Sequence, residues 1–212
     1  MTKSWSFSKL QKYERCPHSI SFPYETFTPN EHAQRGIDIH TKCEQYILHG
    51  GEEPTPGFPW ERLQEAKPEI KLGVDSNWHQ INYNEAWLKF IIDALIITPD
   101  NITIIDFKTG KREYSDVKYT MQLQLYAAAM ASIYPDMELI NTELWYLDEG
   151  HIGQKTYTRE KLNPLRERLN NRAVKMLNDT KLDPWPSKSN CRFCQYNQKC
   201  EFAHESVIRE PE

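Results

Sequence analysis

Two adjacent apolar segments in the middle of the chain constrain its fold more than any other feature. Residues 87–98 (WLKFIIDALIIT) and 102–108 (ITIIDFK) are rich in β-branched and aromatic side chains, and the turn-forming stretch TPDN lies at their junction. This pattern predicts a β-hairpin. One aspartate interrupts each segment, Asp93 in the first and Asp106 in the second, although aspartate is depleted in strands. The chain must therefore place two carboxylates within a largely apolar sheet.

The hairpin register brings these two carboxylates together. If TPDN forms a four-residue turn, Ile97 faces Ile102 and Asp93 lies directly opposite Asp106. Like charges facing each other across a ladder, with Cβ atoms roughly 5 Å apart, are unfavourable and need a compensating cation. The alternative is that both aspartates mark strand ends or exposed faces. The first interpretation predicts a cation site on the hairpin.

Lys108 extends this predicted site. Asp106 and Lys108 are two residues apart, so their side chains leave the same face of the strand, roughly 7 Å apart, whereas Phe107 points the other way. An oxygen-rich pair of carboxylates suits Mg²⁺ or Mn²⁺. A lysine beside such a site can orient or deprotonate a water molecule and offset phosphate charge.

Helical periodicity and one further strand flank the hairpin. We expect helices over residues 6–16, 35–48, 117–134 and 159–178, a strand over 142–147, and a Gly- and Pro-rich loop over 49–59. Ser6 or Ser8 can cap the first helix, the third is apolar almost all round, and Pro164 suits only the first turn of the last helix. This order predicts an α/β core wrapped by helices, with a cysteine-rich end.

Composition limits the class of protein. The 212 residues include 39% hydrophobic and 26% charged side chains, as in a globular chain. No apolar run approaches the roughly 20 residues of a membrane span, and the first residues lack a secretory signal, so we expect a cytoplasmic protein without membrane association. The net charge of -4 excludes a uniformly basic DNA-coating protein, so any nucleic-acid site must be a local patch.

The cysteines indicate a second metal site. Cys191, Cys194 and Cys200 lie within ten residues, and in a reducing cytosol this spacing favours metal ligation over disulfides. Three thiolates are one ligand short of a closed tetrahedral site. Cys16 would complete a four-cysteine site, the usual ligation of an iron–sulfur cluster, whereas His204 would complete a zinc knuckle. The fifth cysteine, Cys43, lies on the apolar side of its helix and is expected to be a core thiol.

In their order along the chain, these motifs resemble the PD-(D/E)XK nuclease superfamily, specifically its RecB-like exonuclease branch. The resemblance rests on Asp93 followed after twelve residues by DFK, then QLQLY, together with YERCP, RGIDIH and the cysteine triplet. It extends from Ser6 to Cys200 and is nearest to small CRISPR-adaptation nucleases and phage recombination or replication exonucleases. It implies a central mixed β-sheet flanked by helices, with a cysteine-ligated cluster joining the N-terminal and C-terminal segments.

The resemblance also implies a role for each matching residue. Lys108 would handle the attacking water, and Gln122 and Tyr126, which share a helix face, would position the phosphate or Lys108. The implied residues form three groups: His40, Asp93, Asp106 and the Phe107 carbonyl as ligands of Mg²⁺ or Mn²⁺; Cys16, Cys191, Cys194 and Cys200 as ligands of a [4Fe-4S] cluster, with Zn²⁺ as the alternative; and Arg35 and Gly36 near the metal and DNA. Asp106 stands where many relatives have glutamate, which shortens that ligand by one methylene.

Less specific readings stay open for two of these assignments. His40 could be an ordinary partly buried histidine, and Gln122 and Tyr126 could serve helix packing alone.

The sequence therefore predicts a metal-dependent deoxyribonuclease. We expect one nuclease domain over 1–212, made of an N-terminal helical part (1–60), a catalytic sheet core (61–158), and a C-terminal helix with the cysteines (159–212). It would act as an exonuclease on single-stranded DNA or DNA ends in recombination, replication, repair or CRISPR adaptation. Lys111, Arg112 and Lys118, with Arg35 and the basic face of the last helix, would contact phosphates.

Two further expectations concern partners and the competing class of protein. A helicase or recombination protein could be a separate partner, since the chain has no GxxxxGK[ST] loop of its own. The alternative function is a non-catalytic DNA-binding or assembly module on a nuclease-like fold. Intact Asp93, Asp106 and Lys108 argue against that alternative.

Overall fold

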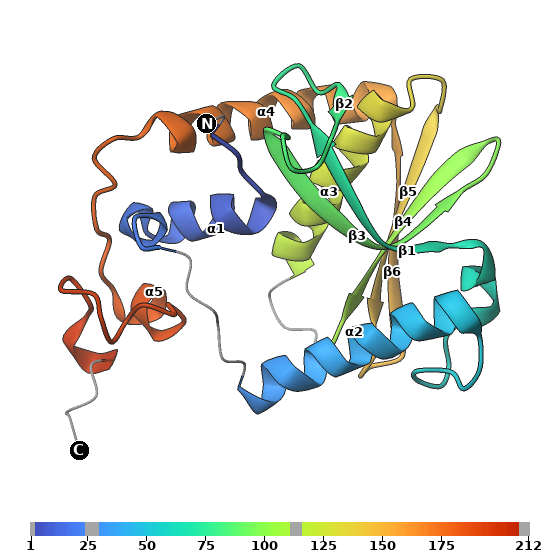
Figure 1. The fold of residues 1–212 in the computed structure, drawn as a ribbon, viewed down its shortest axis with the longest axis horizontal. Helices are drawn as coiled ribbons and strands as arrows, with labels where there is room; N and C mark the ends of the chain where they lie inside the picture. Colours follow the sequence, from blue (N-terminus) through green and yellow to red (C-terminus); the bar gives the residue numbers. More distant parts are fainter. Residues whose placement is uncertain (1–2, 24–29, 111–115, 208–212) are drawn as a thin grey trace. The chain divides into compact units, whose positions relative to one another are not determined.

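A six-stranded mixed sheet forms the centre of the larger of two units in this computed structural model (Figure 1), which describes residues 3–23, 30–110 and 116–207. The first unit is made of Met1–Ser4 and Pro29–Leu169, and the second of Trp5–Thr28 and Asn170–Glu212. Each unit is described by itself. The predicted single domain over 1–212, with its three parts, stays a prediction.

The strands lie in the order β2-β1-β3-β4-β5-β6. Their bounds are Lys67–Val74 for β1, Gln80–Ile81 for β2, Leu88–Ile97 for β3, Asn101–Lys108 for β4, Leu139–Tyr146 for β5 and His151–Thr158 for β6. All neighbours are antiparallel except β4 and β5, which are parallel. Parallel neighbours need a crossover connection, and helix α3 (Asp116–Ile133) provides it.

The predicted hairpin is confirmed in position and register. Strands β3 and β4 pair Ile97 with Ile102 and remain paired as far as Ala94 and Ile105. At the turn, the Thr98 N–H donates to the Asn101 carbonyl at 3.0 Å. The stiff, branched side chains on both sides of a short turn define this register locally, without help from distant parts of the chain.

Helices α2 and α3 cover opposite faces of the sheet (Figure 1). Helix α2 (Glu31–His49) places Cys43, Tyr46 and Ile47 in a buried cluster with Phe107 and Trp145. Helix α3 covers the other face, and all its residues from 125 to 131 are buried, as the apolar sequence predicts. The sheet face under α2 is therefore aromatic, while the face under α3 receives the side chains of alternate residues, including Asp106 and Lys108.

The remaining predicted elements agree with the structure except at two points. Helix α4 spans Arg159–Asn178 as expected, but Pro164 lies inside it and not in its first turn. Strands β1, β2 and β6 were not predicted. Strand β2 is only two residues long and β6 is mostly exposed, so both lack a strong apolar alternation, whereas β1 has such an alternation that the sequence analysis did not use. The loop over 49–59 is confirmed after His49, and Gly50, with φ +70°, ends α2.

The second unit is made of one segment from each end of the chain. It contains α1 (Phe7–Arg15), whose N-cap Ser6 accepts a hydrogen bond from the Lys9 N–H, and the short helix α5 (Lys188–Arg192). Within this unit Arg172 forms a two-bond ion pair with Glu14, with both N–O distances 2.6 Å. Three 3₁₀ turns complete the described chain: Pro17–Ile20 and Glu205–Val207 in this unit, and Trp60–Glu65 in the first. No helix of the described residues is long and apolar enough to cross a membrane.

Candidate active site

Asp93 and Asp106 lie where the β3–β4 ladder ends. Continuing the register by one step sets Asp93 opposite Asp106, as the sequence predicts. Beyond Ala94 and Ile105 the two strands are no longer paired. The Phe107 N–H donates instead to the Asp93 carboxylate at 2.8 Å, in place of a backbone hydrogen bond between the strands. Asp106 is 3% exposed and the Asp93 side chain 14% exposed, so neither carboxylate lies at an exposed strand end.

Lys108 and Gln122 hold the Asp106 carboxylate from two sides. The Lys108 amine forms an ion pair with Asp106 Oδ2, and the Gln122 amide donates to Oδ1 at 3.3 Å. Gln122 also donates to the Tyr126 hydroxyl at 2.9 Å, so the predicted helix pair does converge on the aspartate. Sequence reasoning missed Tyr119, whose ring centroid lies 4.7 Å from the Lys108 Nζ. The ring and Asp106 together hold the amine in place.

His40 approaches the same point from α2. Its Nε2 lies 2.9 Å from the Phe107 carbonyl oxygen, and its Nδ1 lies 3.6 Å from Asp93 Oδ2. The structure thus brings together His40, Asp93 and the Phe107 carbonyl, three of the four donors that the resemblance implies. Asp106 carries the fourth on the adjacent step of the hairpin.

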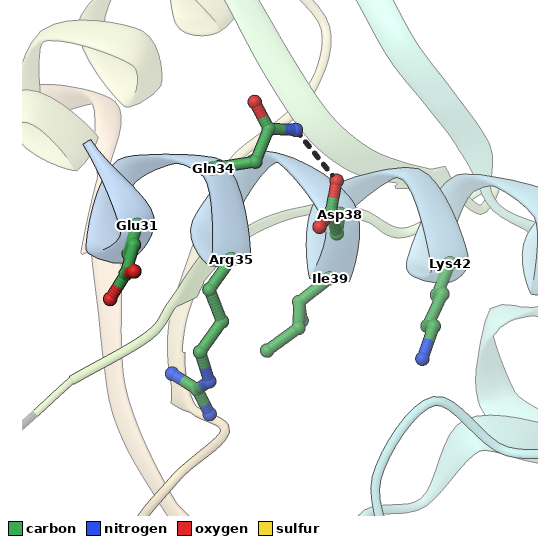
Figure 2. Close-up of a pocket in the computed structure, with 6 residues that line it drawn as sticks. All are labelled: Glu31, Gln34, Arg35, Asp38, Ile39 and Lys42. Carbon is green, nitrogen blue, oxygen red and sulfur yellow. Dashed lines mark hydrogen bonds between the residues drawn. The ribbon is translucent and has the colours of Figure 1, made fainter. Parts of the chain in front are cut away.

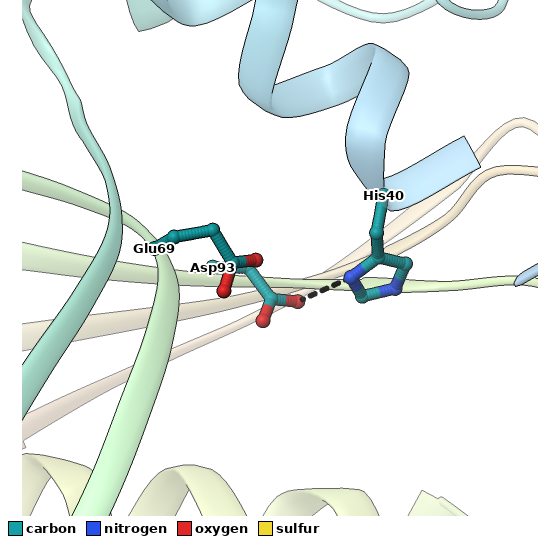
Figure 3. A group of neighbouring side chains, drawn as sticks. All are labelled: His40, Glu69 and Asp93. Atoms are coloured by element: carbon teal, nitrogen blue, oxygen red, sulfur yellow. Dashed lines mark ion pairs between the residues drawn. The ribbon is translucent and has the colours of Figure 1, made fainter. Parts of the chain in front are cut away.

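Glu69 is a further acidic residue that the sequence analysis did not select. Oxygen or nitrogen atoms of His40, Glu69 and Asp93 all lie within 4.8 Å of one another (Figure 3), the only such group of three among the described residues. Glu69 has φ 48°, a left-handed conformation that costs a non-glycine residue energy and is often found at functional sites. Alternating Ile70, Leu72 and Val74 could have indicated strand β1, and hence an acidic residue at its start.

Solvent reaches this group through an open groove between α2 and β1. The groove has a volume of about 550 Å³, and His40 and Glu69 line it together with Lys71. Among its other lining residues are Gly36 and Glu44. A substrate could therefore approach His40 and Glu69 without opening the core.

Burial and neighbouring charges shift the protonation of the site. Burial raises the pKa of Asp93 well above its ordinary value, and the nearby Asp106 carboxylate raises it further. Burial also lowers the pKa of His40, favouring the neutral imidazole that binds metals. For Lys108, burial favours the neutral amine, but Asp106 and Asp93 outweigh it and the net pKa is raised. The Lys108 ammonium compensates Asp106, whereas the charged form of Asp93 stays unfavourable, and the neutral imidazole and carboxylate oxygens fit a divalent cation.

The predicted phosphate-binding residues are more scattered than the residues around Asp93 and Asp106. Arg35 projects from the same side of α2 as Ile39 and Lys42 (Figure 2) and forms an ion pair with Asp148. Lys118 is exposed, with its Nζ 5.7 Å from the Tyr119 ring centroid. Lys111 and Arg112 lie outside the described residues.

The four predicted cluster ligands surround one pocket in the second unit. Cys16, Cys191, Cys194 and Cys200 all line it. Burial raises the pKa of the Cys194 thiol, and the three other thiols add to this effect. Backbone N–H groups of Trp185 and His204 donate to the sulfurs of Cys16 and Cys191 at 3.3 and 3.4 Å. Cys43 is fully buried elsewhere, as predicted for a core thiol.

Comparisons with known proteins identify the superfamily of this chain. The model of the PD-(D/E)XK nuclease superfamily matches residues 58–201, which include Asp93, Asp106 and Lys108, and the chain therefore belongs to that superfamily. This membership indicates a nuclease. A solved structure, the crystal structure of SSO0001, has the same fold with a TM-score of 0.53 and 15% sequence identity, over 96% of this chain and 89% of that chain. The search of curated proteins found no match.

Proposed function

We propose that this chain is a metal-dependent exonuclease of the RecB-like branch that hydrolyses phosphodiester bonds in single-stranded DNA or at DNA ends. One observation carries the proposal: Asp93, Asp106, Lys108, His40 and the Phe107 carbonyl converge where the β3–β4 ladder ends. A non-catalytic DNA-binding or assembly module would have no need to keep two buried carboxylates beside a lysine and an imidazole.

The donor set indicates how a metal would be held. His40, Asp93, Asp106 and the Phe107 carbonyl would bind Mg²⁺ or Mn²⁺, and Glu69 adds a further carboxylate within reach. When bound, the ion would polarise the phosphodiester and lower the pKa of a water molecule.

The protein side chains would orient the reacting groups. Lys108, held by Asp106 and the Tyr119 ring, would donate hydrogen bonds to the attacking water or to a phosphate oxygen. Gln122 fixes the orientation of Asp106, and Tyr126 fixes that of Gln122. Lys71, at the groove between α2 and β1, would offset part of the phosphate charge.

Digestion of end-labelled DNA tests the proposal. We expect wild-type protein with Mg²⁺ or Mn²⁺ to shorten linear single strands or duplex ends, to leave closed circles intact, and to stop when the metal is chelated. Asp106→Asn should reduce the rate at least about a hundredfold, because it removes a ligand charge without changing the side-chain shape. Asp100→Asn, in the exposed hairpin turn, is the matched control. Wild-type activity of Asp106→Asn would revive the assembly-module alternative.

We also propose that the four cysteines bind a [4Fe-4S] cluster in preference to zinc. All four cysteines line one pocket, and four thiolates are the usual ligation of an iron–sulfur cluster. The His204 Nδ1 instead accepts from the Ser206 N–H at 3.2 Å, which favours Cys16 as the fourth ligand.

Anaerobic purification distinguishes the two metals. We expect a brown protein that contains iron and acid-labile sulfide, and we expect Cys16→Ser to lose both. His204→Ala and the core variant Cys43→Ser are the matched controls and should keep the colour. Protein that contains zinc alone, and loses it only in His204→Ala, would contradict the cluster.

A further inference from the structure

Three segments that are distant in the sequence meet at Asp148, in the turn between β5 and β6. Arg35 of α2 donates from Nη1 to Asp148 Oδ2 at 2.9 Å and from Nη2 to Oδ1 at 2.5 Å. The Gly110 N–H, just after β4, donates to the same Oδ2 at 2.5 Å. One carboxylate thus joins a helix, a strand end and a turn. The sequence analysis gave Asp148 no role.

Two more contacts hold the end of β4 at this place. The Leu147 N–H donates to the Lys108 carbonyl at 2.9 Å, which extends the parallel β4–β5 pairing into the turn. On the other side, a Cβ added at Gly36 would lie 3.3 Å from the Thr109 hydroxyl oxygen. Helix α2 therefore approaches the segment after Lys108 as closely as glycine allows.

The position of these contacts connects them to the candidate active site. Arg35 lies five residues before His40 on the same helix, and Gly110 lies two residues after Lys108. The distance between the His40 imidazole and the Phe107 carbonyl therefore depends on how α2 is held against the end of β4. The Arg35 hydrogen bond, with a second from the Gly110 N–H, also lowers the pKa of Asp148, so this carboxylate stays ionised.

We propose that Asp148 is a positioning residue that fixes α2 against the end of β4, so that His40, the Phe107 carbonyl and Lys108 keep the spacing needed for metal binding and hydrolysis. This inference rests on the proposed nuclease function. Asp148 acts through Arg35 and Gly110 and needs no contact with the substrate. Residues that orient metal ligands typically change metal affinity or activity by roughly 10- to 100-fold when they are removed.

The competing role for this pair is direct DNA binding by Arg35. Arg35 is 52% exposed and Asp148 25% exposed, so a phosphate could replace the carboxylate as the partner of the guanidinium. In that case Asp148 would compete with the substrate. The two roles predict opposite effects of Asp148→Ala on the KM for DNA.

The experiment compares four variants with the wild type. Asp148→Ala removes the three hydrogen bonds that the carboxylate accepts, whereas Asp148→Asn keeps an acceptor for Gly110 and for one Arg35 nitrogen. Arg35→Ala and the double variant with Asp148→Ala complete a double-mutant cycle. Asp100→Ala is the matched control, since it removes an exposed carboxylate from the opposite hairpin turn. For each protein, Mn²⁺ affinity is measured by titration calorimetry, and kcat and KM on end-labelled single-stranded DNA.

We expect Asp148→Ala to weaken Mn²⁺ binding and to lower kcat by roughly 10- to 100-fold each, with the KM for DNA changed less than about twofold. Asp148→Asn should recover most of both losses, and the double variant should be no worse than either single alanine variant. An active wild type with an unaffected Asp148→Ala would overturn this inference alone. A lower KM in Asp148→Ala would also overturn it, in favour of direct phosphate binding. A wild type that neither binds Mn²⁺ nor cleaves DNA would overturn the proposed function as well.

Discussion

Replacing Asp93 by asparagine is expected to stabilise the metal-free protein while it removes activity. The Asp93 carboxylate is 14% exposed and lies near Asp106 and Glu69, so its charged form is unfavourable in the folded state. Asparagine keeps the acceptor for the Phe107 N–H and removes the charge. Relieving the desolvation penalty of one buried polar group is worth on the order of 1 kcal/mol, and we expect a gain in stability of that size at neutral pH.

The sign of this effect depends on pH and on metal. The gain should be present above the raised pKa of folded Asp93 and disappear below pH of about 3.9, where the carboxyl is protonated in both states. Mn²⁺ at a hundred times its Kd should stabilise the wild type by about 2.7 kcal/mol and leave Asp93→Asn nearly unchanged. For a chain of this length, 1 kcal/mol corresponds to about 2–4 °C in melting temperature. The order of the two melting temperatures should therefore reverse when metal is added.

Circular dichroism melts of both proteins, in chelator and in Mn²⁺, measure this reversal. Asp100→Asn is the matched control and should follow the wild type in both buffers. The reasoning is refuted if Asp93→Asn melts below the wild type in chelator, because Asp93 would then be stabilising as an anion. Equal stabilisation of both proteins by Mn²⁺ would remove Asp93 from the metal ligands.

Three further predictions concern single residues. Glu69→Gly should keep or slightly raise the melting temperature, because glycine relieves the left-handed backbone that costs about 1–3 kcal/mol. Calorimetry should nevertheless show weaker Mn²⁺ binding, and a large loss of stability would contradict the strain at Glu69. Burial and the Asp179 hydrogen bond raise the pKa of Tyr13 to about 12, so its stabilising effect should be complete below pH of about 10 and lost as the pH rises through 12. Ultraviolet titration should find this phenol, and Asp179→Asn should lower its pKa; an unchanged pKa would dismiss the hydrogen bond as a cause. Burial raises the pKa of Cys43 to about 12, so this thiol should resist Ellman's reagent until the protein unfolds, and its rapid labelling in the native state would show that it is accessible.

Local sequence patterns predicted the hairpin and the helices because short-range interactions decide them. The branched residues on both sides of TPDN set the register, and the register alone predicted the proximity of Asp93 and Asp106. The apolar sequence of α3 likewise predicted its burial. These features depend on residues within about twenty positions of one another, so the chain need not be folded to reveal them.

The sheet edges escaped prediction because their own sequences carry little apolar pattern. Strand β6 is mostly exposed and polar, and it becomes a strand by pairing with β5. The other edge strand, β2, is only two residues long and pairs with β1 alone. With little buried apolar surface of their own, such segments carry a weak periodic signal.

By itself, the sequence determined the chemistry available to this protein: two aspartates and a lysine on one hairpin, and three closely spaced cysteines with a fourth near the other end. Only the tertiary structure decided which other groups join them. It brought His40 to the Phe107 carbonyl, Glu69 to Asp93, and Asp148 to Arg35. The physical reason is that a hairpin register follows from neighbouring residues, whereas contacts between a helix, a strand and a turn depend on non-local packing, which no single segment encodes.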